Sequence, residues 1–127
     1  DVLIVALGTA ARPAVAAAEA LAADGIAAGV LVVAAVHPPP EESLAAALAT
    51  CPVVVTVEAH AAVGGLSSLV AEVIARRRLR CVLRTNAVAR PVHETGSEAH
   101  LLARHGLSAE AVRHAARQGI REQAGIR

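Results

Sequence analysis

Apolar and polar positions follow a repeating pattern along the chain, in which a continuous apolar run is followed by a helical stretch. The first run, VLIVAL at residues 2–7, lacks any alternation, which is typical of a strand buried on both faces of a sheet. Similar runs follow at residues 27–36, 52–58 and 80–86. The pattern therefore predicts four strands, of which at least the first lies inside a sheet covered on both sides.

The segments between and after these runs have helical spacing and end signals. Gly25 is a C-cap for the first helix, and Ser97 and Ser108 are N-caps for the last two. Acidic residues open the second helix, where they interact favourably with the helix dipole. Helices are expected over residues 12–24, 41–50, 65–78, 97–105 and 108–117.

Strands and helices that alternate in this way favour one fold class. They predict an α/β fold with three layers, α/β/α, in which a mainly parallel sheet lies between two layers of helices. A length of 127 residues suits a single domain with one core, and no linker divides the chain. We therefore expect one domain over residues 1–127.

Composition narrows the possible functions. Hydrophobic residues make up 55% of the chain, which excludes disorder, and the longest apolar run has the length of a strand, so no membrane span is expected. A net charge of +1 and the absence of Phe, Tyr and Trp argue against nucleic-acid binding. The chain opens on Asp1 without a signal peptide or initiator Met, so we expect a cytoplasmic domain cut from a longer chain.

The two cysteines, Cys51 and Cys81, lie at the starts of predicted strands and have no metal-like spacing. We interpret both as small core residues.

Candidate chemistry gathers where strands end, because ligands of parallel sheets bind at the carboxyl ends of the strands. Gly8 and Thr9 follow the first strand, and Glu58, His60, Gly64 and Gly65 follow the third. Glu-x-His beside a glycine pair could form a working acid–base pair, and the helix start after the glycines could hold an anion.

A structural interpretation of the same stretch stays open beside the chemical one. Glycines between a strand and a helix allow a tight turn and close packing. Glu58 could then cap the turn, and His60 could form a local hydrogen bond.

Complete catalytic or metal motifs are missing from the sequence. It has no H-E-x-x-H, no G-x-S-x-G, and its GTAARP turn is not a phosphate loop. Residues 97–117 resemble a DNA-binding helix-turn-helix, but glutamates dilute the charge, and we favour an amphipathic end to the fold.

Four segments, taken in order, resemble a known family: DVLIVALGTAARPAVAAAEALAADGI, HPPPEESLAAALA, VVVTVEAHAAVGGLSSLVAEVI and ETGSEAHLLARHGLSAEAVRHAAR. Together they are similar to the C-terminal domain of transketolases, a family that includes 1-deoxyxylulose-5-phosphate synthases and the beta subunits of 2-oxoacid dehydrogenases. The resemblance implies a three-layer fold with strand order 2-1-3-4, preceded in the family by a short antiparallel strand.

The resemblance also implies a division of labour. Family enzymes use thiamine diphosphate and Mg²⁺, which are held by two other domains, so this chain is expected to carry no catalytic, cofactor-binding or metal residues. Gly8, Thr9, Glu58, His60, Gly64 and Gly65 are then residues of an interface or anion loop. Expected partners are the cofactor-binding domains or subunits of the same enzyme, in a homodimer.

Two questions remain open from the sequence. The chain is either a fragment or one subunit of a split enzyme. The alternative function is a free-standing regulatory module that binds a phosphate or nucleotide at the Gly8 and Gly64 turns.

Overall fold

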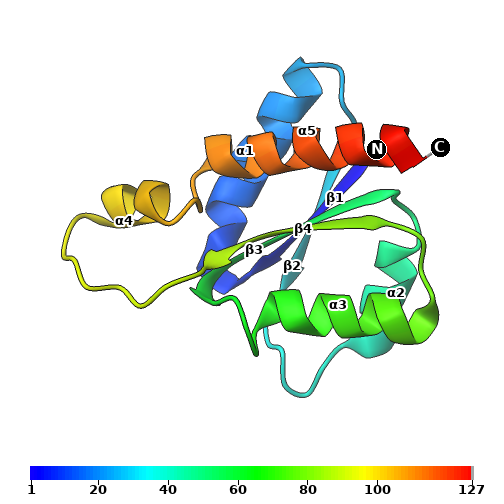
Figure 1. The fold of residues 1–127 in the computed structure, drawn as a ribbon, viewed down its shortest axis with the longest axis horizontal. Helices are drawn as coiled ribbons and strands as arrows, with labels where there is room; N and C mark the ends of the chain where they lie inside the picture. Colours follow the sequence, from blue (N-terminus) through cyan, green and yellow to red (C-terminus); the bar gives the residue numbers. More distant parts are fainter. Residues whose placement is uncertain (127) are drawn as a thin grey trace.

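The computed structural model describes residues 1–126 as a four-stranded, fully parallel sheet with helices on both faces (Figure 1). The strand order is β2-β1-β3-β4, so both the predicted α/β class and the order implied by the resemblance are confirmed. The elements are β1 (Val2–Leu7), the 3₁₀ turn η1 (Gly8–Ala10), α1 (Ala11–Ala23), β2 (Ala28–Val33), α2 (Glu41–Leu48), β3 (Val53–Ala61), α3 (Leu66–Arg77), β4 (Val82–Val88), α4 (Glu98–Arg104) and α5 (Ala109–Ile126).

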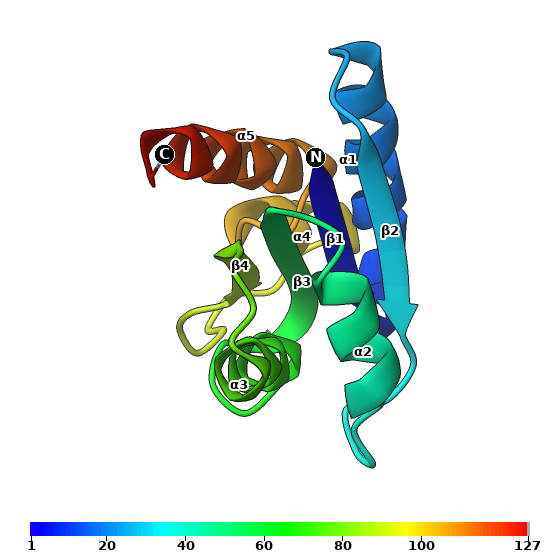
Figure 2. The ribbon, with the colours of Figure 1, turned by 90° about the vertical axis from the view of Figure 1, so that its right-hand side faces the viewer.

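The core consists of two apolar layers, one on each face of the sheet. Side chains of β1 alternate between them, since Ile4 packs toward α1 and α5 whereas Val5 packs toward α2 and α3. Figures 1 and 2 show the two pairs of helices on opposite sides of the strands. The central strands β1 and β3 are buried on both faces, as the unbroken apolar runs predicted.

Three predicted boundaries were wrong in an informative way. The second strand ends at Val33 instead of residue 36, and three prolines at residues 38–40 follow soon after it. The third strand continues to Ala61, past a register shift against β4 that resumes the pairing at Ala61 and Val88. The last helix continues to Ile126 instead of ending near residue 117.

Both cysteines are half-buried, and their thiols are free. They pack against the core layer under α2 and α3 without being part of it, so their interpretation as core residues is correct only in part. Burial raises the pKa of the Cys81 thiol, which disfavours its reactive thiolate.

Of the helices formed by residues 1–126, none combines the length and the apolar content that a membrane span requires.

Candidate functional site

The candidate loop follows β3 at the carboxyl edge of the sheet. Residues Val53 to Glu58 of β3 are buried, and the chain becomes exposed at Ala59. Strand periodicity directs Val54, Thr56 and Glu58 to the face that α3 covers. The strand therefore carries a carboxylate into the interior at the point where the helix begins.

Glu58 caps helix α3 from inside the protein. Its Oε2 accepts a hydrogen bond from the backbone N–H of Leu66 at 2.7 Å, and its Oε1 accepts one from that of Ser67 at 2.8 Å. The hydroxyl of Ser67 donates to the same Oε1 at 2.7 Å and lies 3.0 Å from Oγ1 of Thr56. The carboxylate also faces the positive end of the helix dipole. The structural interpretation of Glu58 as a cap is thus confirmed.

The two glycines serve different purposes in this joint. Gly64 has φ +88°, a left-handed conformation that side chains other than glycine rarely adopt. Gly65 has φ −105° but cannot carry a Cβ, since that atom would lie 2.1 Å from Oε2 of Glu58 and 2.9 Å from Nδ1 of His60. Gly65 therefore makes room for the capping carboxylate.

His60 lies beside this network but is not part of it. It is exposed, and its Nδ1 lies 3.1 Å from the carbonyl oxygen of Ala61. Within residues 1–126 His60 forms no hydrogen bond with Glu58, whose oxygens are occupied by α3. The two residues thus lie near each other at the end of β3 but do not form an acid–base pair.

Gly8 and Thr9 belong to η1, which leads β1 into α1. Gly8 is left-handed, with φ +55°. Thr9 joins Ala59 in the wall of an apolar cavity of about 410 Å³ under α4. Four of the six predicted residues thus lie at the β3–α3 joint: Glu58, His60, Gly64 and Gly65. Gly8 and Thr9 lie in η1, and Thr9 lines the neighbouring cavity.

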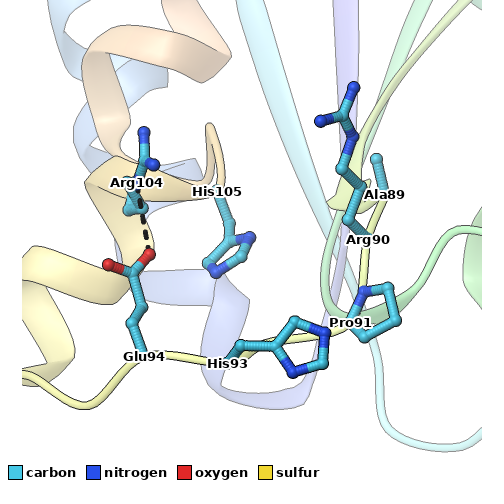
Figure 3. Close-up of a pocket in the computed structure, with 7 residues that line it drawn as sticks. All are labelled: Ala89, Arg90, Pro91, His93, Glu94, Arg104 and His105. Carbon is cyan, nitrogen blue, oxygen red and sulfur yellow. Dashed lines mark hydrogen bonds and ion pairs between the residues drawn. The ribbon is translucent and has the colours of Figure 1, made fainter.

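Sequence patterns missed a second group of polar residues at this edge. Arg90 and His93 follow β4, and Arg104 and His105 end α4; all four line a hollow of about 550 Å³ (Figure 3). The signal that could have found them is the density of Arg and His in RPVHE and ARH, on either side of one short helix.

A magnesium site would need several ligands gathered around one point. Across residues 1–126 there is no group of three or more His, Cys, Asp or Glu side chains arranged to hold a metal ion. Among the described residues, no preformed cluster of such side chains is thus available to bind Mg²⁺.

The family described as "Transketolase, C-terminal domain" matches residues 1–112. The chain belongs to this family. A 1-deoxy-D-xylulose-5-phosphate synthase of Anaeromyxobacter sp. is 36% identical to this transketolase C-terminal domain over an alignment of 127 positions, which covers 98% of the chain and 20% of that relative. One of the subunits of an apulose-4-phosphate transketolase from Actinobacillus succinogenes is 33% identical over 112 residues, 87% of the chain and 36% of that protein.

Solved structures agree with the sequence relatives. A split-gene transketolase, described as an inactive beta4 tetramer, superimposes with a TM-score of 0.85 at 36% identity over 94% of this chain and 39% of its own. The resemblance inferred from the sequence is confirmed. The chain spans only about a fifth of the length of the synthase that it matches.

Proposed function

We propose that this chain is the third domain of a transketolase-like enzyme and that it supplies domain and subunit contacts in place of catalytic groups. Relatives that are several times longer support the first part. The occurrence of related domains in a transketolase subunit and in a tetramer supports the second. The observation that carries the proposal is the loop between β3 and α3, which holds an exposed apolar side chain on a rigid frame.

The frame is rigid because its ends are held by hydrogen bonds. Glu58 fixes the start of α3, the N–H of Ala62 donates to the carbonyl of Val88 at 3.1 Å, and the N–H of Gly64 donates to Oγ of Ser68 at 2.8 Å. A preorganised loop loses little conformational entropy when it docks against a partner.

Val63 lies at the tip of this frame with 86% of its surface exposed, more than any other large hydrophobic residue of the described part of the chain. Ala59 and Ala61 at the end of β3 are exposed as well, so the surface around Val63 is mainly apolar. Isolated apolar residues are common on surfaces, but a rigid apolar tip at the carboxyl edge suits burial in another domain.

The complete enzyme in this proposal transfers two-carbon or acyl units. Thiamine diphosphate with Mg²⁺ supplies the carbanion chemistry and is held by other domains or subunits, in a cytoplasmic homodimer. The residues of this chain act on that site only through the domains against which they pack.

The test is substitution of the loop tip in the native assembly. Val63→Asp places a charge in the proposed contact without disturbing a buried side chain, and we expect it to weaken assembly by on the order of tenfold or more in sedimentation velocity. Ile126→Asp is the matched control, since Ile126 is also exposed, at 72%, but lies at the far end of α5. Equal assembly of the two variants would contradict the proposal.

The regulatory-module alternative stays a prediction. The helix-start N–H groups that it would use beside Gly64 already bind Glu58, so no observation on this loop favours it.

A further inference from the structure

The hollow after β4 has a composition unlike the rest of the carboxyl edge. Its walls come from the segment of residues 89–94 on one side and the end of α4 on the other (Figure 3). The chemically active side chains are Arg90, His93, Glu94, Arg104 and His105. Four of these five can carry positive charge, and one carries negative charge.

The single carboxylate is already engaged at one wall. Glu94 accepts a hydrogen bond from Nε of Arg104 at 3.1 Å, and its other oxygen lies 3.7 Å from Nε2 of His100. Arg90 has no ion-pair partner within residues 1–126. The hollow therefore presents Arg90, His93 and His105 around a space with an excess of cationic and hydrogen-bonding groups.

His105 also borders the apolar cavity of about 410 Å³, so the two spaces adjoin at this side chain. Val88, Val92, Leu101 and Leu102 supply most of the apolar wall. The Nε2 atom of His105 is buried and lacks a hydrogen-bond partner among the described residues. His105 therefore meets the hollow with the remaining, accessible part of its ring, beside Arg90 and His93.

We propose that this pair of spaces binds a small phosphate monoester with a short apolar body. The phosphate lies in the hollow among Arg90, His93 and His105, and the apolar body lies against Leu101 and Leu102. A phosphate offers three terminal oxygens to these donors, whereas a carboxylate offers two, and Arg pairs well with phosphate. This site is separate from the Glu58 cap and does not depend on the proposed role in assembly.

The test uses the native protein and three probes: inorganic phosphate, butyl phosphate and pentanoate. In calorimetry, butyl phosphate is expected to bind about tenfold more tightly than inorganic phosphate, because part of its chain is removed from water. Pentanoate, which keeps the apolar chain and loses one oxygen, is expected to bind more weakly than butyl phosphate. Histidine ¹⁵N NMR locates the binding, since the ring signals of His93 and His105 should move with the same saturation curve.

Two arginine variants make the test specific. Arg90→Ala removes an exposed side chain of the hollow and is expected to weaken butyl phosphate binding by about tenfold, the loss expected for a charge-assisted contact. Arg80→Ala is the control, because it removes the same charge from another exposed arginine. Arg80 precedes β4 and therefore lies at the amino ends of the strands, away from the hollow. Leu101→Ala should remove the advantage of butyl phosphate over phosphate.

Several outcomes would overturn the proposal. One is equal binding of butyl phosphate and inorganic phosphate to the unaltered protein. Another is the same loss in Arg90→Ala and Arg80→Ala, which would indicate a general charge effect. Unmoved ring signals of His93 and His105 at saturating probe would place the ligand elsewhere. None of these outcomes bears on assembly through Val63, so the two proposals fail independently.

Discussion

A single buried carboxylate organises the joint between β3 and α3. Glu58 is fully buried, and three donors from Leu66 and Ser67 meet its oxygens, so it replaces the side-chain cap that Gly65 cannot provide. Caps usually come from the residue that immediately precedes the helix. Here the cap comes from the preceding strand, which couples the sheet to the helix start and fixes the loop between them.

Removal of this cap should destabilise the fold far more than removal of the neighbouring histidine. Glu58→Ala leaves two buried backbone N–H groups without an acceptor, for which we expect a cost on the order of 3 kcal/mol and a melting temperature lower by on the order of 10 °C. Gly65→Ala should act in the same direction, because its Cβ would displace the carboxylate. The melting temperatures of both variants can be measured by thermal unfolding, monitored by circular dichroism.

His60→Ala is the matched control, since His60 is exposed and hydrogen-bonds only locally. We expect a change within about 0.5 kcal/mol, as for other surface substitutions. If Glu58→Ala melted like His60→Ala, the carboxylate would not be holding the helix start.

Features of this joint that depend on neighbouring residues could be predicted from the sequence, whereas contacts between residues further apart along the chain could not. The order of strand, Glu58, glycine pair and helix indicated a joint with a cap, and this was correct. The close approach of Gly65 to a side chain seven residues earlier depends on tertiary geometry, and no local pattern encodes it. Arg90 and His105 were missed for the same reason, since only the fold brings the two ends of the α4 region around one hollow.

At the scale of elements, packing changed the predicted ends. The segment QGIREQAG has two glycines, which cost about 1 kcal/mol each relative to alanine in a helix interior, so the pattern favoured an end near residue 117. Gly119 is instead buried within α5, where a Cβ would lie 2.6 Å from Cγ1 of Val53. The missing side chain lets the helix pack closely on β3, and Ile120 joins the core. Tertiary contact thus overrides local propensity.

An ion cluster between α1 and α5 should make stability depend on pH. The C-cap of α1 is Asp24 and not Gly25 as predicted, since Gly25 follows it with φ +77°. Oδ2 of Asp24 lies 2.8 Å from guanidinium nitrogens of both Arg117 and Arg113. Hydrogen bonds from Arg117 and then Arg113 lower the pKa of Asp24 below its ordinary value of 3.8. A lowered pKa means that the stabilisation is present above the unfolded pKa and is lost as the pH falls through the folded value.

We therefore expect Asp24→Asn to melt at a lower temperature than the unaltered protein at pH 7, with the gap closing as the pH falls below about 3.9. Glu19→Gln is the control, because Glu19 is an exposed residue of α1 without an ion-pair partner within residues 1–126. Melting temperatures measured across this pH range test the cluster. A gap for Asp24→Asn that is the same at every pH would show that the carboxylate charge is not the cause.

At the scale of the whole molecule, alternation of apolar runs and helices was enough to predict the fold class, and four ordered segments were enough to predict the family. Each of these two predictions rests on a signal that is repeated along the chain, so an error at one strand or helix boundary does not change it. The proposed role in domain contacts has no such repeated signal, because it rests on single exposed residues such as Val63. The function therefore has to be tested on the assembly.

In the proposed enzyme the cofactor is bound by other domains, so we expect this chain alone not to bind it through Mg²⁺. In that enzyme other domains hold the diphosphate and its Mg²⁺, and residues 1–126 contain no group of three or more His, Cys, Asp or Glu side chains placed to bind a metal ion. Titration calorimetry of this chain alone with thiamine diphosphate and Mg²⁺ should therefore show no magnesium-dependent heat, in a sample whose circular dichroism confirms a folded α/β domain. Addition of the cofactor-binding partner should restore that heat.

The magnesium dependence separates this prediction from the phosphate site. A diphosphate held weakly by Arg90 in the hollow would bind equally well without Mg²⁺ and would be lost in Arg90→Ala. Magnesium-dependent binding with micromolar affinity by the chain alone would instead require metal ligands in the domain itself. That result would overturn the assignment of the cofactor to other domains, and with it the proposal that the Glu58 loop serves contacts and takes no part in the chemistry.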